Sequence, residues 1–323
     1  MESIFHKITK QIKRHSNVII MAHKNIDLDA FGSALCLYKI IQSMDIPCGI
    51  FMSNEELDAT INIAKKKLEE RSIIVDYYDR SNYKHYVTPE TLLVIVDTHK
   101  KTMVEYPEIL SEVNDVVVID HHIKSTEAVE NAKVFYINSS LSSTNEWMVN
   151  YLKYLNKTVS PLVATIMLAG IEIDTNGFNL KTTDKTYEAA AFLTKLGADH
   201  IQKQELLKEN KQSYLKRQDF VKTSFMINAN MAMCLLDNEI HKKADLAMIA
   251  EELLKFENVE ASFAIGKLSE EVIGVSARSV GNINVEKIMN AIGGGGHKTD
   301  AAAQLEHITI QEVKTKIEEI VNA

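Results

Sequence analysis

The chain has 323 residues, of which 46% are hydrophobic and 25% are charged, and its formal net charge at pH 7 is -8. This composition is typical of a folded globular protein, and the length predicts two domains. The negative charge disfavours binding along a long nucleic acid, which needs a basic surface, and no apolar run reaches the roughly 18 to 20 residues that span a bilayer.

The N-terminal segment and the cysteines indicate a reducing compartment. Residues 1–17 place apolar residues at helical spacing and lack the apolar core of a signal peptide, so we expect an opening amphipathic helix. Cys36, Cys48 and Cys234 are odd in number and widely spaced, which argues against a disulfide framework and against a zinc knuckle. We therefore expect a cytoplasmic protein.

Short apolar runs alternate with helical stretches through the first half of the chain. The runs are rich in Val and Ile and cover 17–23, 48–53, 91–98 and 115–122. Apolar residues recur at helical spacing over 29–44, 55–70, 142–156 and 161–172. This rhythm is typical of a parallel sheet with crossover helices, so residues 1–183 are predicted to form an α/β domain with flanking helices.

The second half of the chain is predicted to contain a linker and a smaller domain. Residues 184–218 have helical spacing with a single Gly197, and we expect one long helix there, assigned as a linker over 184–219; an ordinary surface helix is the alternative. Residues 220–323 predict a smaller α/β domain. Its strands are expected at 224–236, 260–269, 271–280 and 301–305, and its helices at 244–256, 284–292 and 309–321.

Acidic and imidazole side chains follow the predicted strands and one helix. They are His23, Asp27, Asp29, Asp97, Asp120, His121, His122 and Asp174. Taken alone, an Asp at such an end is often only a helix cap. Ligands collect at the carboxyl ends of parallel strands, and carboxylates that converge there repel one another unless cations neutralise them. The mixture of carboxylates and imidazoles suits a divalent ion, Mn²⁺ first, with Mg²⁺, Co²⁺ or Fe²⁺ as alternatives.

A second candidate site lies in the C-terminal part. The motif GGGGH uses four of the twelve glycines, at Gly293, Gly294, Gly295 and Gly296, followed by His297. Consecutive glycine amides can form an anion-binding nest, to which His297 would add a donor. Arg278, at the end of a predicted strand, can make a forked contact to phosphate, although a surface ion pair is the alternative. Together they predict a site for the substrate.

The order of these motifs resembles the DHH phosphoesterases, which include RecJ-type exonucleases, oligoribonucleases and manganese pyrophosphatases. Residues 276–305 resemble the DHH-associated domain that follows in one branch. The resemblance implies a site with two Mn²⁺ ions bridged by Asp97. One ion would be completed by His23 and Asp27, and the other by Asp29, His121 and Asp174. His122 would face the substrate phosphate, and Asp120 would orient the histidine pair.

Several strings are similar to the catalytic domains of GdpP-type cyclic-di-AMP phosphodiesterases, namely 21–34, 118–122, 142–144, 206–210 and 276–289. This likeness implies an enzyme that hydrolyses cyclic di-AMP to 5′-pApA through a metal-activated water. Its partners would be cyclic or short linear dinucleotides, and homodimer formation is an alternative that the sequence leaves undecided. An oligoribonuclease (nanoRNase) or pAp phosphatase is the alternative, and a non-catalytic nucleotide sensor is a third hypothesis.

The chain also departs from that family. Full-length GdpP proteins carry membrane helices and further domains before the similar part, so we expect either a stand-alone enzyme or a catalytic fragment that is tethered to the membrane through the rest of its protein. Ile26 replaces a common Pro, and Lys124 stands where Arg is common. Glu172 is a carboxylate without an assigned role.

Overall fold

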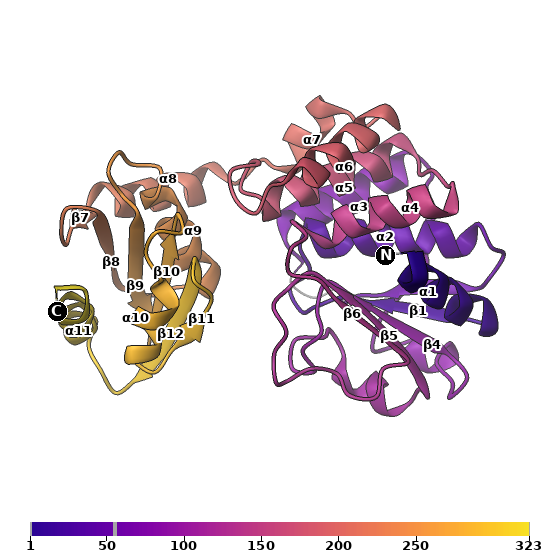
Figure 1. The fold of residues 1–323 in the computed structure, drawn as a ribbon, viewed down its shortest axis with the longest axis horizontal. Helices are drawn as coiled ribbons and strands as arrows, with labels where there is room; N and C mark the ends of the chain where they lie inside the picture. The colour runs from indigo at the N-terminus through magenta and orange to yellow at the C-terminus, as the bar shows by residue number, and fades with distance from the viewer. Residues whose placement is uncertain (1, 54–56, 323) are drawn as a thin grey trace. The chain divides into compact units, whose positions relative to one another are not determined.

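The computed structural model describes residues 2–53 and 57–322 and divides into two compact units, Met1–Lys208 and Glu209–Ala323 (Figure 1). The first unit is built on a sheet of six described strands. They are β1 (Val18–Met21), β2 (Cys48–Phe51), β3 (Tyr77–Tyr78), β4 (Leu92–Val96), β5 (Asp115–Asp120) and β6 (Val134–Ile137). Their order is β3-β2-β1-β4-β5-β6, and all neighbours are parallel, which confirms the predicted parallel α/β fold.

This strand order determines where a ligand can bind. The chain leaves β1 for β2 on one side and later returns to β4 on the other side. Open α/β sheets bind ligands at such a switch point, beyond the carboxyl ends of the strands. Because β1, β4 and β5 are adjacent, the polar residues that follow these three strands meet at one edge of the sheet.

Helices cover one face of this sheet, and short helical turns lie on the other. The helices are α1 (Glu2–Arg14), α2 (Leu28–Gln42), α3 (Ala59–Glu70), α4 (Thr144–Leu155), α5 (Pro161–Asp174), α6 (Asp184–Lys195) and α7 (His200–Leu206), and the 3₁₀ turns are η1 (Tyr83–His85) and η2 (Pro107–Ser111). Alternate strand residues face the two sides: Ile20 packs among the helices, whereas Ile19 packs among the turns. Figure 1 shows this layered arrangement.

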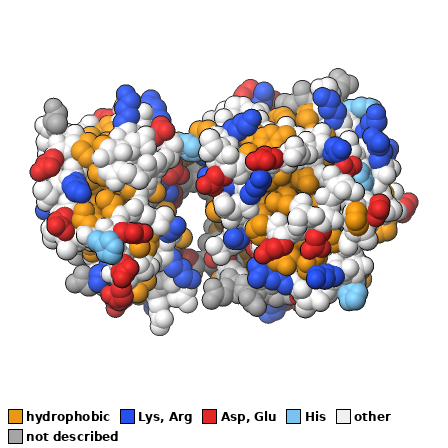
Figure 2. Space-filling view, turned by 90° about the horizontal axis from the view of Figure 1, so that it is seen from below, with side chains coloured by type: hydrophobic (Ala, Val, Ile, Leu, Met, Phe, Trp, Pro, Cys, Tyr) orange, Lys and Arg blue, Asp and Glu red, His pale blue; other side chains and the backbone are white. Residues whose placement is uncertain are grey.

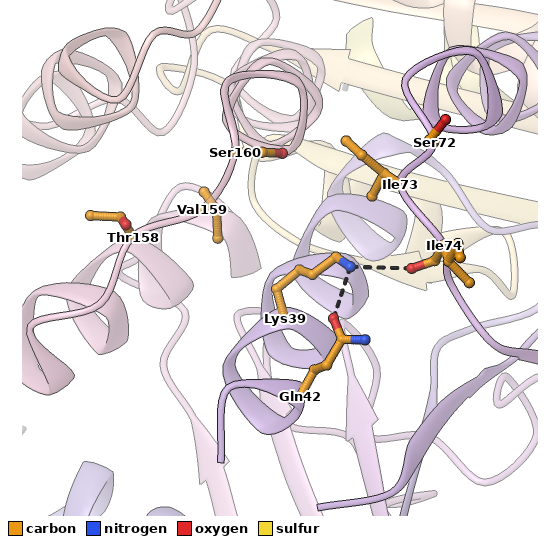
Figure 3. Close-up of a pocket in the computed structure, with 8 residues that line it drawn as sticks. All are labelled: Lys39, Gln42, Ser72, Ile73, Ile74, Thr158, Val159 and Ser160. Carbon is orange, nitrogen blue, oxygen red and sulfur yellow. Dashed lines mark hydrogen bonds between the residues drawn. The ribbon is translucent and has the colours of Figure 1, made fainter. Parts of the chain in front are cut away.

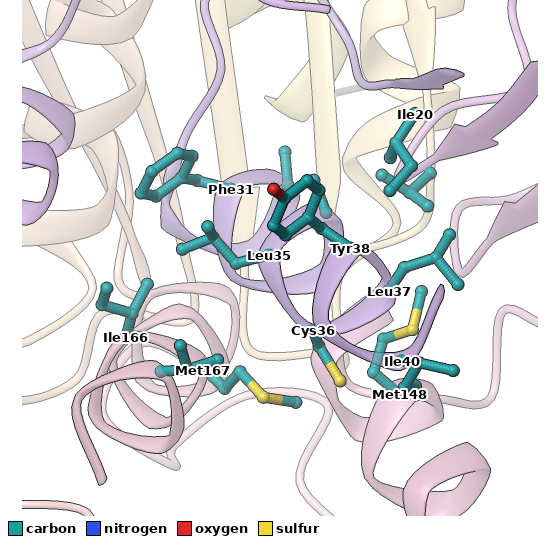
Figure 4. Close-up of a cluster of buried hydrophobic side chains, with 14 of the residues drawn as sticks. Ile20, Phe31, Leu35, Cys36, Leu37, Tyr38, Ile40, Met148, Ile166 and Met167 are labelled. Carbon is teal, nitrogen blue, oxygen red and sulfur yellow. The ribbon is translucent and has the colours of Figure 1, made fainter. Parts of the chain in front are cut away.

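Helix α2 lies at the centre of the first unit. Of its residues, only Lys39 and Gln42 are not buried, as expected for a helix that is apolar on all sides. Figure 4 shows side chains of α2, such as Leu35 and Cys36, beside Met148 and Met167, which come from α4 and α5. The first turn of α2 carries Asp29, so a tightly packed element fixes the position of this carboxylate.

The long helix expected over 184–218 is wrong. The structure has three helices instead, α6, α7 and α8 (Lys211–Lys222). Gly197 adopts φ +92 after α6, a backbone conformation that favours glycine. The side chains of Asp199 and Asn210 then cap the first amides of α7 and α8, so each polar residue starts a new helix.

The second unit has a mixed sheet. Its described strands are β7 (Phe225–Met226), β8 (Met231–Ile240), β9 (Ala261–Lys267), β10 (Val272–Ser279), β11 (Gly295–Gly296) and β12 (Asp300–Glu306), in the order β11-β12-β10-β9-β8-β7. Only the β8–β9 pair is parallel among these. Helix α9 (Lys243–Leu253) packs on one face, and α10 (Val285–Ala291) and α11 (Ile310–Asn322) pack on the other.

The apolar character of the helices and the charge of the surface concern the partners that the chain could bind. Within the described residues, no helix has both the length and the apolar character that a membrane crossing requires. On the face seen in Figure 2, basic and acidic side chains are interspersed over each unit. That face has the mixed charge of an ordinary globular surface.

Candidate metal centre

Elements of the first unit bring six predicted ligands to one edge of the sheet. His23 and Asp97 follow β1 and β4, and His121 follows Asp120, the last residue of β5. Asp27 is the N-cap of α2, and Asp29 lies in the first turn of this helix. Asp174 is the last residue of α5.

Their side chains form two clusters that share Asp97. Oδ2 of Asp97 lies 3.4 Å from Nε2 of His23, which lies 3.7 Å from Oδ2 of Asp27. Oδ1 of Asp97 lies 3.3 Å from Nε2 of His121, which lies 3.1 Å from Asp174 and 3.9 Å from Asp29. The two oxygens of one carboxylate therefore face different clusters.

Each cluster is compact enough to surround an ion. Ligand atoms of His23, Asp27 and Asp97 lie within 4.8 Å of one another, and so do those of Asp29, His121 and Asp174. A further group within the same limit joins His122 to Asp97 and His121. Imidazole nitrogens mixed with carboxylate oxygens are a donor set that divalent transition metals accept.

His121 provides a test of whether these residues fit a metal. Its side chain is buried, and neither ring nitrogen has a hydrogen-bond partner, although carboxylate oxygens of Asp97 and Asp174 lie close to Nε2. The close carboxylate oxygens thus do not accept a hydrogen bond from Nε2 of His121. Since buried polar atoms without partners are rare in native proteins, this geometry fits a metal ligand.

The charges of the two clusters are strongly coupled. Burial alone would raise the pKa of Asp97, but the positive charge of the nearby His121 and His23 rings holds it well below its usual range. Burial alone would lower the pKa of His23, but the hydrogen bond to Asp97 and the charges of Asp27 and Asp97 raise it to about 10. In the metal-free protein, protonated imidazoles therefore supply the positive charge that the carboxylates require.

The pKa values of the two carboxylates at the start of α2 are raised, in contrast to the pKa of Asp97. Burial raises the pKa of Asp27 to about 6, with further increases from the charges of Asp97 and Asp174. Burial and the same two charges raise the pKa of Asp29 well above its usual range. This mutual repulsion is the condition that a bound cation relieves. Asp97 also has φ +61, a conformation that is rare for residues other than glycine and that often occurs at functional sites.

The N-terminus of α4 supports this centre, although the sequence analysis did not assign it a role there. The amides of Thr144 and Asn145 donate to the two carboxylate oxygens of Asp29, at 2.7 and 2.9 Å. The hydroxyl of Thr144 donates to Oδ1 of Asp97 at 2.7 Å. A helix N-terminus favours an anion, so α4 holds Asp29 in place. The sequence signal was the string 142–144, which resembles the family and lies at the start of the helix predicted over 142–156.

Asp120 contacts one member of the predicted histidine pair, His122. Its Oδ1 accepts hydrogen bonds from Nδ1 of His122 at 2.7 Å and from the amide of His122 at 3.1 Å. Its Oδ2 pairs with Nδ1 of His99, and the hydrogen bonds of both histidines hold the pKa of Asp120 below its usual range although burial opposes this shift. Asp120 thus contacts His122 and His99, whereas His121 has no hydrogen bond to it. The sequence analysis missed His99, which lies in a loop without periodicity.

Two other residues noted in the sequence have contacts of their own. Glu172 forms an ion pair with the buried Lys203, so it joins α5 to α7. Lys124 is exposed, and its Nζ lies 5.5 Å from the ring centre of Phe135.

The predicted substrate residues of the second unit are extensively paired within that unit. The guanidinium of Arg278 lies 2.6 Å from Asp300 and 3.3 Å from Glu251, and it donates to Ser276 at 3.1 Å. The surface ion pair that was the alternative for Arg278 is therefore present. His297, which is half-buried, donates its amide to the carbonyl of Asp300 at 2.6 Å.

The prediction that the four glycines form an anion-binding nest is wrong. The amides of Gly293 and Gly294 bind the carbonyls of Asn290 and Met289, at 3.1 and 2.8 Å, so they end α10 rather than face an anion. Gly295 and Gly296 pair with β12. A Cβ on Gly294 would lie 2.3 Å from the carbonyl oxygen of Ala302. Glycine is required here because β12 approaches the backbone closely.

A separate hollow of 480 Å³ in the first unit lacks the chemistry of a metal site (Figure 3). Its lining consists of Lys39, Gln42, Ser72, Ile73, Ile74, Thr158, Val159 and Ser160. The ammonium of Lys39 already donates to Gln42 at 2.9 Å and to the carbonyl of Ile74 at 3.1 Å. This lining offers neither imidazole nor carboxylate.

The sequence matches two domain families. Residues 17–171 match the DHH family, N-terminal domain, and residues 228–323 match the DHHA1 domain. The chain is 36% identical to the cyclic-di-AMP phosphodiesterase GdpP of Geobacillus thermodenitrificans, over 99% of this chain and 49% of that protein. It is 34% identical to the cyclic-di-AMP phosphodiesterase PdeA of Listeria monocytogenes, over 97% of this chain and 48% of that protein. The chain thus covers only about half of each of these relatives.

More distant proteins resemble the chain over most of their length. The bifunctional oligoribonuclease and PAP phosphatase NrnA of Mycoplasma genitalium is 26% identical over 90% of this chain and 89% of that protein. The crystal structure of an exopolyphosphatase-related protein from Bacteroides fragilis has a TM-score of 0.81 at 19% identity, and the match covers 100% of this chain and 96% of that one. This structural likeness shows a shared fold.

Proposed function

The chain belongs to the DHH family, with a DHHA1 domain after its DHH domain, and on that basis we propose that it hydrolyses cyclic di-AMP to linear 5′-pApA with two bound Mn²⁺ ions. The main observation in support is Asp97, whose two oxygens face two separate ligand clusters. The substrate is inferred from the relatives GdpP and PdeA, which bear the name of this activity.

The proposed ligands divide between two ions that share Asp97. His23 and Asp27 complete one set, and Asp29, His121 and Asp174 complete the other. Two bound divalent ions supply an activated water and neutralise the charge that develops on the phosphoryl oxygens. Mn²⁺ suits the mixed donors, and Mg²⁺, Co²⁺ and Fe²⁺ are the alternatives to be compared with it.

The remaining proposed residues bind and orient the substrate. His122 has a side chain that is 48% exposed and keeps its Nδ1 on Asp120, so Nε2 is the ring nitrogen that can donate to a phosphate oxygen when the ring is doubly protonated. Asp120 acts through His122 and does not touch the phosphate. Arg278 and His297 are proposed to hold the far end of the dinucleotide, with the guanidinium of Arg278 as the main anion donor.

A nanoRNase or pAp phosphatase is the second candidate. It is favoured by NrnA, which this chain matches over most of the length of both proteins. A sensor without catalysis is less well supported, because every ligand expected from the family resemblance is present and the structure clusters all six. The two enzymatic candidates use the same metals and differ in the substrate that is turned over fastest.

Product analysis separates these functions. The purified chain would be incubated with Mn²⁺ and, separately, with cyclic di-AMP, cyclic di-GMP, pApA and pAp, and the products would be resolved by chromatography. We expect cyclic di-AMP to be opened to pApA faster than pAp is dephosphorylated, and we expect Asp97→Asn to abolish both reactions. Preference for pAp or short RNA would support the second candidate, and binding without turnover would support a sensor.

A further inference from the structure

His99 is a buried histidine outside the two ligand clusters, and its hydrogen bonds define its tautomer. Its exposed fraction is 1%. The amide of Ser125 donates to Nε2 of His99 at 2.8 Å. Because an amide can only donate, this nitrogen carries no proton. The proton of a neutral His99 must then lie on Nδ1, which donates it to Oδ2 of Asp120.

Asp120 transmits this arrangement to His122. The carboxylate is 2% exposed, and its second oxygen accepts from Nδ1 of His122 at 2.7 Å. With Asp120 ionised and accepting from both rings, His122 also carries its proton on Nδ1. Its Nε2 is then the nitrogen that remains available outside this chain of hydrogen bonds.

His99 also holds the loop that follows the DHH motif. Its carbonyl accepts a 2.7 Å hydrogen bond from the amide of Val129, and the amide of Lys101 donates to the carbonyl of Glu127 at 3.0 Å. Together with the bond from Ser125 to its ring, these contacts attach residues 125–129 to residues 99–101. The ring of His99 is therefore hydrogen-bonded directly to this loop, through the amide of Ser125, and indirectly to His122, through Asp120.

We propose that His99 is a positioning residue that fixes the ring orientation and tautomer of His122 through Asp120. The proposal rests on the proposed function in one respect, since it assumes that Nε2 of His122 meets the substrate. Within the part of the chain that the structure describes, His99 forms no hydrogen bond to the six proposed metal ligands. Its loss should therefore impair turnover without removing the ions.

Two substitutions separate the two ring contacts. In His99→Asn, the side-chain amide can occupy the place of Nδ1 and donate to Asp120, but it cannot reach the amide of Ser125. In His99→Gln, the longer side chain can place an oxygen where Nε2 accepts from Ser125, and the donor to Asp120 is lost. We expect kcat to fall about tenfold to a hundredfold in His99→Gln and to be largely retained in His99→Asn, as for other residues that orient ligands.

The tautomer is measured directly by nitrogen NMR of the histidine rings in the metal-free and Mg²⁺-loaded protein, with His122 assigned by comparison with His122→Gln. In the unsubstituted protein, His99 and His122 should both carry the proton on Nδ1. In His99→Gln, the signal of His122 should move toward the other tautomer, and Mn²⁺ titration should still show two ions.

His241→Gln is a matched control. His241 is 7% exposed and pairs with Asp237 at 2.8 Å in the second unit, so its replacement also removes a buried histidine and carboxylate contact. It should lower the melting temperature without changing the tautomer of His122.

The outcomes are distinct. A neutral His122 ring in the unsubstituted protein with its only proton on Nε2 would overturn the proposal without any variant. Equal loss of kcat in both His99 variants, with loss of Mn²⁺ binding, would mean that His99 is only structural. If the tautomers agree with the proposal but no dinucleotide is hydrolysed, the proposed function fails and the positioning role stands.

Discussion

The hydroxyl of Thr144 lies 2.7 Å from Oδ1 of Asp97, and its backbone amide lies 2.7 Å from Oδ2 of Asp29. One residue at the start of α4 thus holds two carboxylates of the candidate metal centre. This contact links a helix that contributes no proposed ligand to the residue that both proposed ions would share.

The Thr144 hydroxyl should therefore matter for metal binding. Thr144→Val keeps the shape but removes the donor, and a hydrogen bond to a charged group contributes about 1.5 to 3 kcal/mol. We expect Mn²⁺ affinity to fall about tenfold to a hundredfold by calorimetry. Thr144→Ser retains the hydroxyl and is the control. Equal affinity in the Val variant and the unsubstituted protein would show that α4 does not support the centre.

Asp97 should be required for both ions. Asp97→Ala removes the shared carboxylate, and we expect elemental analysis to find neither ion and the rate to fall on the order of a thousandfold or more. Asp97→Asn should be nearly as damaging because the amide nitrogen is no ligand. Asp115→Asn is the control, since Asp115 begins β5 at the opposite end of this strand. Two tightly bound ions in an active Asp97→Ala protein would contradict the assignment.

The convergence of Asp97 and His121 at one edge of the sheet could be predicted from the strand pattern. Asp97 and His121 each follow a Val- and Ile-rich run, and a parallel sheet brings the ends of such strands to one edge. The contacts of Thr144 and His99 depend on how a helix and a loop pack against that edge, which no periodicity encodes. The long linker helix was wrong because Asp199 and Asn210 are helix caps, although in sequence they resemble ordinary polar surface residues.

Metal binding should release protons. The pKa of His23 is about 10 in the metal-free fold and about 6.5 when unperturbed. The protonated ring therefore stabilises the metal-free fold fully below the unperturbed value, and this contribution is lost as pH rises through about 10. A histidine that binds a metal must be neutral, so between these values metal binding displaces a proton from His23 and the affinity rises with pH.

Calorimetry can count these protons. Mn²⁺ would be titrated in two buffers that differ in ionisation enthalpy, at about pH 7.5, where His23 is still protonated. We expect the heat of binding to depend on the buffer, and we expect His23→Asn to release fewer protons. Identical heats in both buffers would show that His23 does not change protonation when the metal binds.

Gly170 should be intolerant of a side chain. A Cβ there would lie 2.4 Å from Nδ2 of Asn145 and 2.6 Å from the carbonyl oxygen of Leu28, which cannot move freely. We expect Gly170→Ala to lower the free energy of unfolding by about 1 to 3 kcal/mol and to weaken Mn²⁺ binding, because Asn145 holds Asp29. Gly32→Ala, whose nearest atom lies at 2.9 Å, should be milder. Chemical denaturation tests this order, and a stable Gly170→Ala protein would refute it.

The ion pair of Arg278 and its proposed contact to phosphate can be separated, because the guanidinium is paired with Asp300 in the second unit. If Arg278 holds the substrate phosphate, Arg278→Ala should raise KM by the equivalent of about 1.5 to 3 kcal/mol. Asp300→Asn removes the ionic partner but keeps the guanidinium, so it should leave KM much less affected. Mn²⁺ affinity should be unchanged in both variants, since all six proposed ligands lie in the first unit.

His297→Ala completes this test. The substitution His297→Ala should lower kcat as well as raise KM if the His297 ring donates to an oxygen whose negative charge grows during attack. Steady-state kinetics on cyclic di-AMP, measured beside Mn²⁺ calorimetry, distinguishes the cases.

If Asp300→Asn raises KM as much as Arg278→Ala does, the ion pair alone explains the effect of Arg278, because both substitutions break that pair and only Arg278→Ala removes the phosphate donor. If either Arg278→Ala or His297→Ala loses Mn²⁺, the second unit would have to take part in the metal centre, which contradicts the assignment of all six ligands to residues 23–174.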